Sequence, residues 1–101
     1  MSIYVILDID VHDKEKYLKY QQQVPALIEK YGGRYIVRGG DIFAIGEWKP
    51  ERIVILEFPS LEKLQAFLSS PEYQPVKRFR DEAATSKIIA VEGCTEDFPS
   101  L

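Results

Sequence analysis

Residues 3–10 alternate between two kinds of side chain, which predicts a β-strand with one apolar face and one mixed face. The apolar side carries Ile3, Val5, Leu7 and Ile9. Residues 52–58 repeat this alternation and predict a later strand whose second face carries Ile53, Ile55 and Glu57. Because both strands have apolar side chains on each face, we expect both faces of the sheet to be covered.

After the first strand the spacing of apolar residues changes to three and four, which predicts a helix. Its apolar face carries Tyr17, Tyr20, Val24, Leu27, Ile28 and Tyr31. Asp13 is placed to cap the helix N-terminus, and Gly32 with Gly33 to end the helix. Pro25 lies inside the pattern and lacks an N–H for the carbonyl of Gln21, so we expect a kink or a break there.

Two glycines divide the next extended segment. Residues 34–38 predict a second strand, and the apolar pattern resumes at residues 42–45 after Gly39 and Gly40. Glycines between extended segments indicate a bulge or a tight turn, where the backbone needs a positive φ or a close approach. Trp48 follows in the connection to the strand at residues 52–58, and we interpret it as an interface residue.

The second half of the chain predicts two short helices and a last strand. Ser60 caps the first helix, Ser70 and Pro71 begin the second, and residues 87–92 form the strand. The element order is the split βαβ plan of an α+β ferredoxin-like sandwich, in which helices cover one face of a four-stranded antiparallel sheet. We expect residues 1–94 to form one domain and residues 95–101 a C-terminal tail.

Composition excludes several classes of protein. The chain has 101 residues with 13 Lys and Arg against 16 Asp and Glu, and a formal net charge of −3 without a basic run argues against a nucleic-acid partner. The single cysteine, Cys94, cannot form an intrachain disulfide, and with His12 it supplies too few ligands for a metal site. No apolar run approaches the roughly 20 residues that cross a bilayer. We therefore expect a cytoplasmic protein without a metal or other cofactor and without a membrane partner.

Five short motifs resemble one family in their order along the chain. They are Gly-Gly-Arg at 32–34, Arg-Gly-Gly at 38–40, Trp-Lys-Pro-Glu-Arg at 48–52, Glu-Phe-Pro-Ser at 57–60 and Ser-Pro-Glu-Tyr at 70–73. The sequence from Tyr4 to Gly93 resembles the family called domain of unknown function thirteen-thirty, within the dimeric α+β barrel superfamily. The resemblance implies a homodimer that pairs through its open sheet faces, but it implies no reaction. The wider superfamily includes cofactor-independent monooxygenases, small isomerases and stress-responsive proteins.

Arg38 is the first candidate for a binding residue. A guanidinium at a strand end, next to Gly39 that opens room around it, is suited to hold a carboxylate or enolate through two hydrogen bonds. The alternative is a structural ion pair with Glu57 on the neighbouring strand. If Glu57 is buried without a partner, its pKa should rise, and it becomes a candidate catalytic acid or base.

Three further side chains are candidates for the same ligand site. Arg80 can supply a second positive charge, and Tyr73 and Tyr20 can supply phenol hydroxyls. The alternatives are an arginine on a solvated helix face and tyrosines at the edge of the core. His12 is a second catalytic candidate because its ordinary pKa lies near neutrality. The alternative is a surface histidine, and the resemblance favours it, since we expect a small hydroxyl residue at this position in the family.

These candidates leave two functions open. In the first, the protein binds a small anionic or carbonyl-bearing molecule in a pocket near Arg38, as a cofactor-independent oxygenase or isomerase would. In the second, it is a non-enzymatic dimeric binding or stress-related module without turnover, and the same charges complete its core. A cavity beside Arg38 would favour the first function, and a filled core would favour the second.

Overall fold

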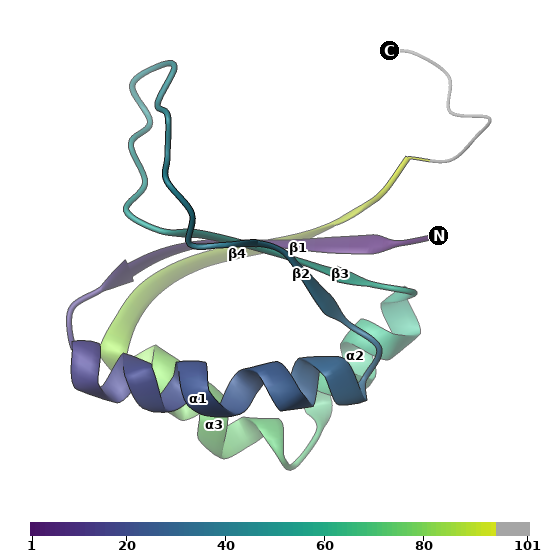
Figure 1. Cartoon of the computed structure of the whole chain (residues 1–101). Helices are drawn as coiled ribbons and strands as arrows, with labels where there is room; N and C mark the ends of the chain where they lie inside the picture. The colour runs from purple at the N-terminus through teal and green to yellow at the C-terminus, as the bar shows by residue number, and fades with distance from the viewer. Residues whose placement is uncertain (95–101) are drawn as a thin grey trace.

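The computed structural model describes residues 1–94, in which helices cover one face of a single antiparallel sheet (Figure 1). The elements are β1 (Ile3–Val11), α1 (Lys14–Lys30), β2 (Arg34–Arg38), β3 (Ile53–Phe58), α2 (Leu61–Ser69), α3 (Tyr73–Ala83) and β4 (Ala84–Glu92). The strand order is β2-β3-β1-β4 and every neighbouring pair is antiparallel. The predicted ferredoxin-like α+β fold is confirmed. The expected tail at residues 95–101 lies outside the described residues.

The two central strands place their side chains as the alternation predicts. The apolar set of β1 and the set Val54, Leu56 and Phe58 of β3 are buried against the helices. Phe58 stacks on Phe67 of α2, with ring centroids 5.4 Å apart, and Phe67 stacks on Tyr73 of α3 at 4.3 Å. On the other face, Ile6 of β1 stands opposite Ile55 of β3. No helix within residues 1–94 covers this second face, which we call the open face (Figure 1).

Helix α1 is capped as predicted but is not broken by Pro25. The Asp13 side chain accepts a hydrogen bond from the backbone N–H of Lys16 at 3.1 Å, and the helix continues unbroken to Lys30. Buried Val24 and Ile28 hold the segment around Pro25 against the sheet, which offsets the roughly 3 kcal/mol that an interior proline costs. Within residues 1–94, none of the three helices combines the length and apolar character needed to cross a membrane. A cytoplasmic location stays a prediction.

Two element boundaries differ from the sequence prediction. β4 begins at Ala84, directly after α3, instead of at residue 87. Residues 42–45 form no strand, and the whole segment 39–52 is a loop that rises from the open face (Figure 1). Gly39 has a φ of +68°, as a tight turn requires, but the bulge lies earlier, where the register shifts between Tyr35 and Val37 of β2.

Candidate functional site

The space beside Gly39 is filled by Arg52. A Cβ atom at Gly39 would collide with the Arg52 guanidinium, which lies 5.7 Å from the ring centre of Tyr17. Arg38 itself is exposed, and its guanidinium lies 4.4 Å from the ring centre of Tyr35. The cavity that both arginines line has a volume of about 20 Å³, little more than the 10–15 Å³ or so that one water needs. The glycines therefore do not open a ligand-sized pocket beside Arg38.

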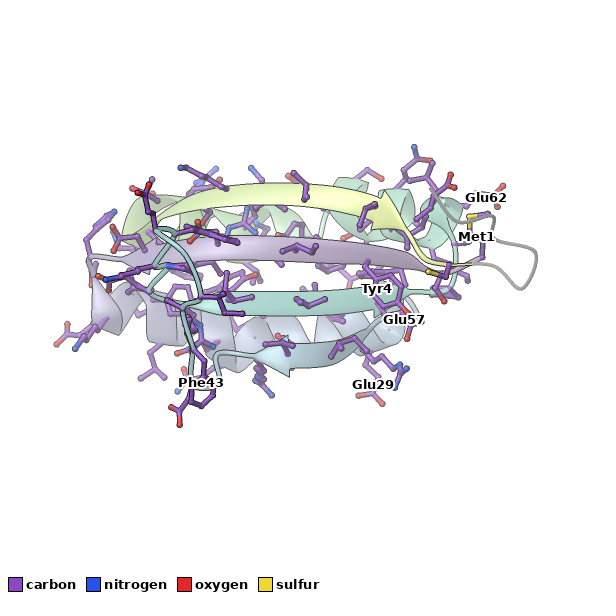
Figure 2. The ribbon with its side chains drawn as sticks, turned by 90° about the horizontal axis from the view of Figure 1, so that it is seen from above. Met1, Tyr4, Glu29, Phe43, Glu57 and Glu62 are labelled. Atoms are coloured by element: carbon purple, nitrogen blue, oxygen red, sulfur yellow. The ribbon has the colours of Figure 1, made fainter. Side chains whose placement is uncertain are left out.

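Glu57 pairs with Arg34 and not with Arg38, so the predicted alternative ion pair is wrong. Glu57 Oε1 accepts a hydrogen bond from Arg34 Nε at 2.7 Å, and Oε2 accepts one from the Tyr4 hydroxyl at 3.1 Å. The strand register explains this, because Arg34 and Tyr4 stand directly opposite Glu57 and Arg38 lies at the other end of β2. Figure 2 shows Tyr4 and Glu57 next to each other on neighbouring strands.

The same contacts determine the charge of Glu57. Hydrogen bonds from Ser2, then from Arg34 and Tyr4, lower the pKa of Glu57 below its ordinary value, although burial acts in the opposite direction. The carboxylate is therefore ionised at neutral pH, when a general acid would need its proton. The condition for a raised pKa, a Glu57 buried without a partner, is therefore not met.

His12 lies in the turn between β1 and α1 with an exposed side chain. Its backbone N–H donates to the carbonyl of Ala83 at 2.9 Å, which fixes the turn against the end of α3. β1 separates it from Glu57, because Glu57 pairs near the start of that strand and His12 follows its end. The two catalytic candidates are therefore not brought together.

Arg80, Tyr73 and Tyr20 meet inside the molecule. Only 5% of Arg80 is exposed, so the alternative of a solvated arginine is wrong. Its Nη1 donates to the Tyr73 hydroxyl at 2.9 Å, and its guanidinium lies 5.6 Å from the ring centre of Tyr20. The Arg80 Nε–H is buried and has no acceptor among residues 1–94. Three of the predicted binding residues thus form one cluster, which we call the Arg80 cluster.

A cavity of about 160 Å³ lies against the Arg80 cluster, between α2, α3 and the helix-facing side of the sheet. Its apolar wall includes Leu7, Leu56, Leu64, Phe67, Leu68 and Ile88. Leu68 and Ile88 are 47% and 42% exposed, so they mark the mouth of the cavity. Lys77 also lines it, and sequence reasoning missed this residue although it precedes Arg80 by three positions on the same helix face.

Every polar side chain of this cavity can donate a hydrogen bond. Arg80 does not lose its proton in proteins, and it therefore offers N–H groups only. Burial, followed by the neighbouring Tyr73, raises the pKa of Tyr20 far above its ordinary value, in spite of the opposing effect of Arg80. The Tyr20 phenol therefore stays protonated. No carboxylate lines the cavity within residues 1–94, so the site suits an electron-rich oxygen on a mainly apolar molecule.

Fold and cavity together define a ferredoxin-like α+β domain with an open sheet face and a cavity between its helices and the sheet. Residues 2–94 match the family described as Domain of unknown function (DUF1330), and the chain belongs to that family. The resemblance of the five sequence motifs is thus confirmed. No curated protein matches the chain.

Solved structures share the fold at low sequence identity. A protein of unknown function from Rhodopseudomonas palustris is 19% identical with a TM-score of 0.77, over 93% of this chain and 83% of its own. A dimeric ferredoxin-like protein of unknown function from Jannaschia sp. CCS1 is 9% identical with a TM-score of 0.68, over 92% and 100%. SnoaB, a cofactor-independent oxygenase from Streptomyces nogalater, is 11% identical with a TM-score of 0.63, over 95% and 96%. Identities this low establish the fold alone.

Proposed function

We propose that this protein binds a small, mainly apolar molecule with a carboxylate, enolate or carbonyl oxygen in the cavity beside the Arg80 cluster. One observation carries the proposal: Arg80 is almost fully buried, lines the cavity and has an Nε–H without an acceptor in residues 1–94. A buried donor without a partner costs about 1–3 kcal/mol, and more when it is charged. A ligand oxygen would supply the missing acceptor.

This proposal moves the ligand away from Arg38 and Gly39, where the filled space favours the alternative of charges that complete the core. The small cavity at Arg38 and the larger one at Arg80 lie on two sides of Tyr20, which lines both. Tyr73 and Tyr20 would then orient the ligand, and Glu57 and His12 would take no part. The cavity offers hydrogen-bond donors but no carboxylate or histidine base among residues 1–94, so it favours binding over proton abstraction. The same donors would stabilise an enolate oxygen during a reaction. A reaction here would need a substrate that already carries the enolate, so cofactor-independent oxygenation of such a substrate is the reaction class to assay first.

Titration of small aromatic and aliphatic acids and ketones, followed by two-dimensional NMR, tests the proposal. Saturable shifts should appear in wild type, should disappear in Arg80→Met, and should persist in Arg78→Met, which changes an exposed arginine of the same helix. Because Arg80→Met removes a buried hydrogen bond and could fail to fold, Ile88→Trp serves as a second variant that obstructs the mouth and keeps Arg80. Wild-type binding that survives both Arg80→Met and Ile88→Trp would contradict this site.

We also propose that two copies pair through the open face and the loop at residues 39–52. The loop and the sheet enclose an apolar hollow of about 600 Å³, whose wall includes Ile6, Ile55, Ile89, Phe43, Ile45 and Trp48. Phe43 and Ile45 are 85% and 102% exposed, which costs roughly 25 cal/mol per Å² of apolar surface left in water. The likeness to a dimeric protein of the same fold supports this pairing.

A further inference from the structure

Two cations of α3 line the ligand cavity, and one carboxylate outside its wall contacts both. Lys77 and Arg80 are neighbours on one helix face. Asp81 Oδ2 accepts a hydrogen bond from Lys77 Nζ at 2.9 Å, and Oδ1 accepts one from Arg80 Nη2 at 3.3 Å. Asp81 itself is not part of the cavity wall, and 47% of its side chain is exposed.

This arrangement leaves the cavity with an excess of positive charge. Two cations share one carboxylate, and water screens both that carboxylate and Lys77, because their side chains are 47% and 44% exposed. The charge in excess inside the molecule is that of Arg80, which lies in the interior, where charge interactions are stronger than at the surface. Its carboxylate partner, Asp81, is shared with Lys77 and half exposed. A neutral ligand would leave this excess in place, whereas an anionic ligand would compensate it.

We infer that the cavity selects a small organic anion, a carboxylate or enolate on an apolar body, over a neutral carbonyl compound of the same shape, and that Asp81 sets the affinity by competing with the ligand for Arg80 and Lys77. This inference rests on the proposed function and narrows its ligand class. Asp81 is a positioning residue, because it acts on the ligand only through the two cations.

Benzoate and benzamide form a test pair with nearly the same shape and different charge. Titration is followed at the Arg80 Nε–H signal in an ¹⁵N–¹H correlation spectrum. We expect benzoate to bind wild type about tenfold more tightly than benzamide, because both accept hydrogen bonds from the Arg80 guanidinium but only benzoate adds the attraction between opposite charges in the interior. Asp81→Asn should raise the affinity for benzoate about threefold or more and leave the affinity for benzamide unchanged.

Glu82→Gln is the matched control. Glu82 is the next residue along α3, and its carboxylate pairs with Lys16 of α1 at 3.2 Å. The substitution removes the same charge from the same helix without touching Arg80, so benzoate affinity should stay at the wild-type value. An equal gain of benzoate affinity in Glu82→Gln would show that the effect of Asp81→Asn comes from net charge alone, and it would overturn the role assigned to Asp81.

The remaining outcomes separate this inference from the proposed function. Equal affinity of wild type for benzoate and benzamide would overturn the selection for an anion without contradicting the proposed binding site. Loss of both ligands in Asp81→Asn would show that Asp81 only holds Arg80 in place, and it would overturn the competition. If neither compound shifts the Arg80 Nε–H signal, and the other acids and ketones do not shift it either, both the proposed function and this inference are contradicted.

Discussion

At Gly33 the backbone passes directly against two buried side chains. An added Cβ atom would lie 2.7 Å from Cζ of Phe58 and 2.9 Å from Cγ2 of Ile28. Because both neighbours are fixed in the core, we expect Gly33→Ala to lower the free energy of unfolding by about 1–3 kcal/mol in urea titrations. Gly40→Ala is the control, since its Cβ would meet no atom within 4 Å, and its effect should stay within about 0.5 kcal/mol. Equal effects of both substitutions would contradict this prediction.

The lowered pKa of Glu57 predicts that the protein loses stability in acid. Its pKa in the folded protein lies below the ordinary value of 4.5, so the folded state binds fewer protons than the unfolded state near that pH. The stabilisation by Glu57 is therefore present above the ordinary pKa and is lost as the pH falls through the lowered one. Urea titrations between neutral pH and pH ~3 should show a smaller decline of stability in Glu57→Gln than in wild type.

Glu29→Gln provides the comparison for this pH dependence. It removes the same charge from an exposed position near the end of α1, away from the proposed pairing surface. Its stability curve should keep the wild-type dependence on pH, because Glu29 accepts no hydrogen bond from a side chain within residues 1–94. A flattened curve in Glu29→Gln would assign the effect to net charge and not to the contacts of Glu57.

The residues of the Arg80 cluster show where prediction from sequence ends. The sequence identified Arg80, Tyr73 and Tyr20 by their chemistry, but the helix pattern could not decide whether Arg80 faces water or the core. That depends on Tyr20 and the other groups that α1 and the sheet bring against it, which lie far away in the chain. The space at Gly39 was likewise unpredictable, because Arg52 fills it from the far end of a long loop.

At the scale of an element, Pro25 in α1 gives a prediction about helix stability. The helix is unbroken although Pro25 leaves the Gln21 carbonyl without its usual N–H donor. We expect Pro25→Ala to raise the free energy of unfolding by about 1–2 kcal/mol, because the restored hydrogen bond outweighs the greater entropy of the unfolded chain. Gln22→Ala at an exposed position of the same helix should change it by less than about 0.5 kcal/mol. A destabilised Pro25→Ala would show that the proline ring packs better than this account allows.

Elements with a strong hydrophobic period were predictable, and those without one were not. The faces of β1 and β3 follow directly from their alternation, since one side is buried by helices and the other is not. The first residues of β4, Ala84 and Thr85, are small or polar and carry little signal, so only pairing with β1 reveals them as strand. Residues 42–45 have an apolar pattern but no strand to pair with, and they stay a loop.

At the scale of the whole molecule, the proposed pairing of two copies predicts the effect of charges on the loop. Phe43 projects from the loop in the view onto the open face (Figure 2). Phe43→Asp and Ile45→Asp should each convert the dimer to a monomer in light-scattering measurements at micromolar concentration, because an aspartate would be buried without a partner. Leu61→Asp is the control, since Leu61 is 52% exposed at the start of α2 on the opposite side of the sheet. A monomeric wild type, or dimers in both loop variants, would refute this mode of pairing.

The unequal edges of the sheet affect how the protein behaves when it is concentrated. β2 has five residues, is bulged, and carries an arginine at each end, so it is a poor template for a strand of another molecule. β4 has nine residues, pairs with β1 without a register shift, and has no strand on its outer side within residues 1–94. Lys87 is the one charged residue in its interior. We therefore expect association through strand edges at high concentration to involve β4 before β2, and the charge of Lys87 to oppose it.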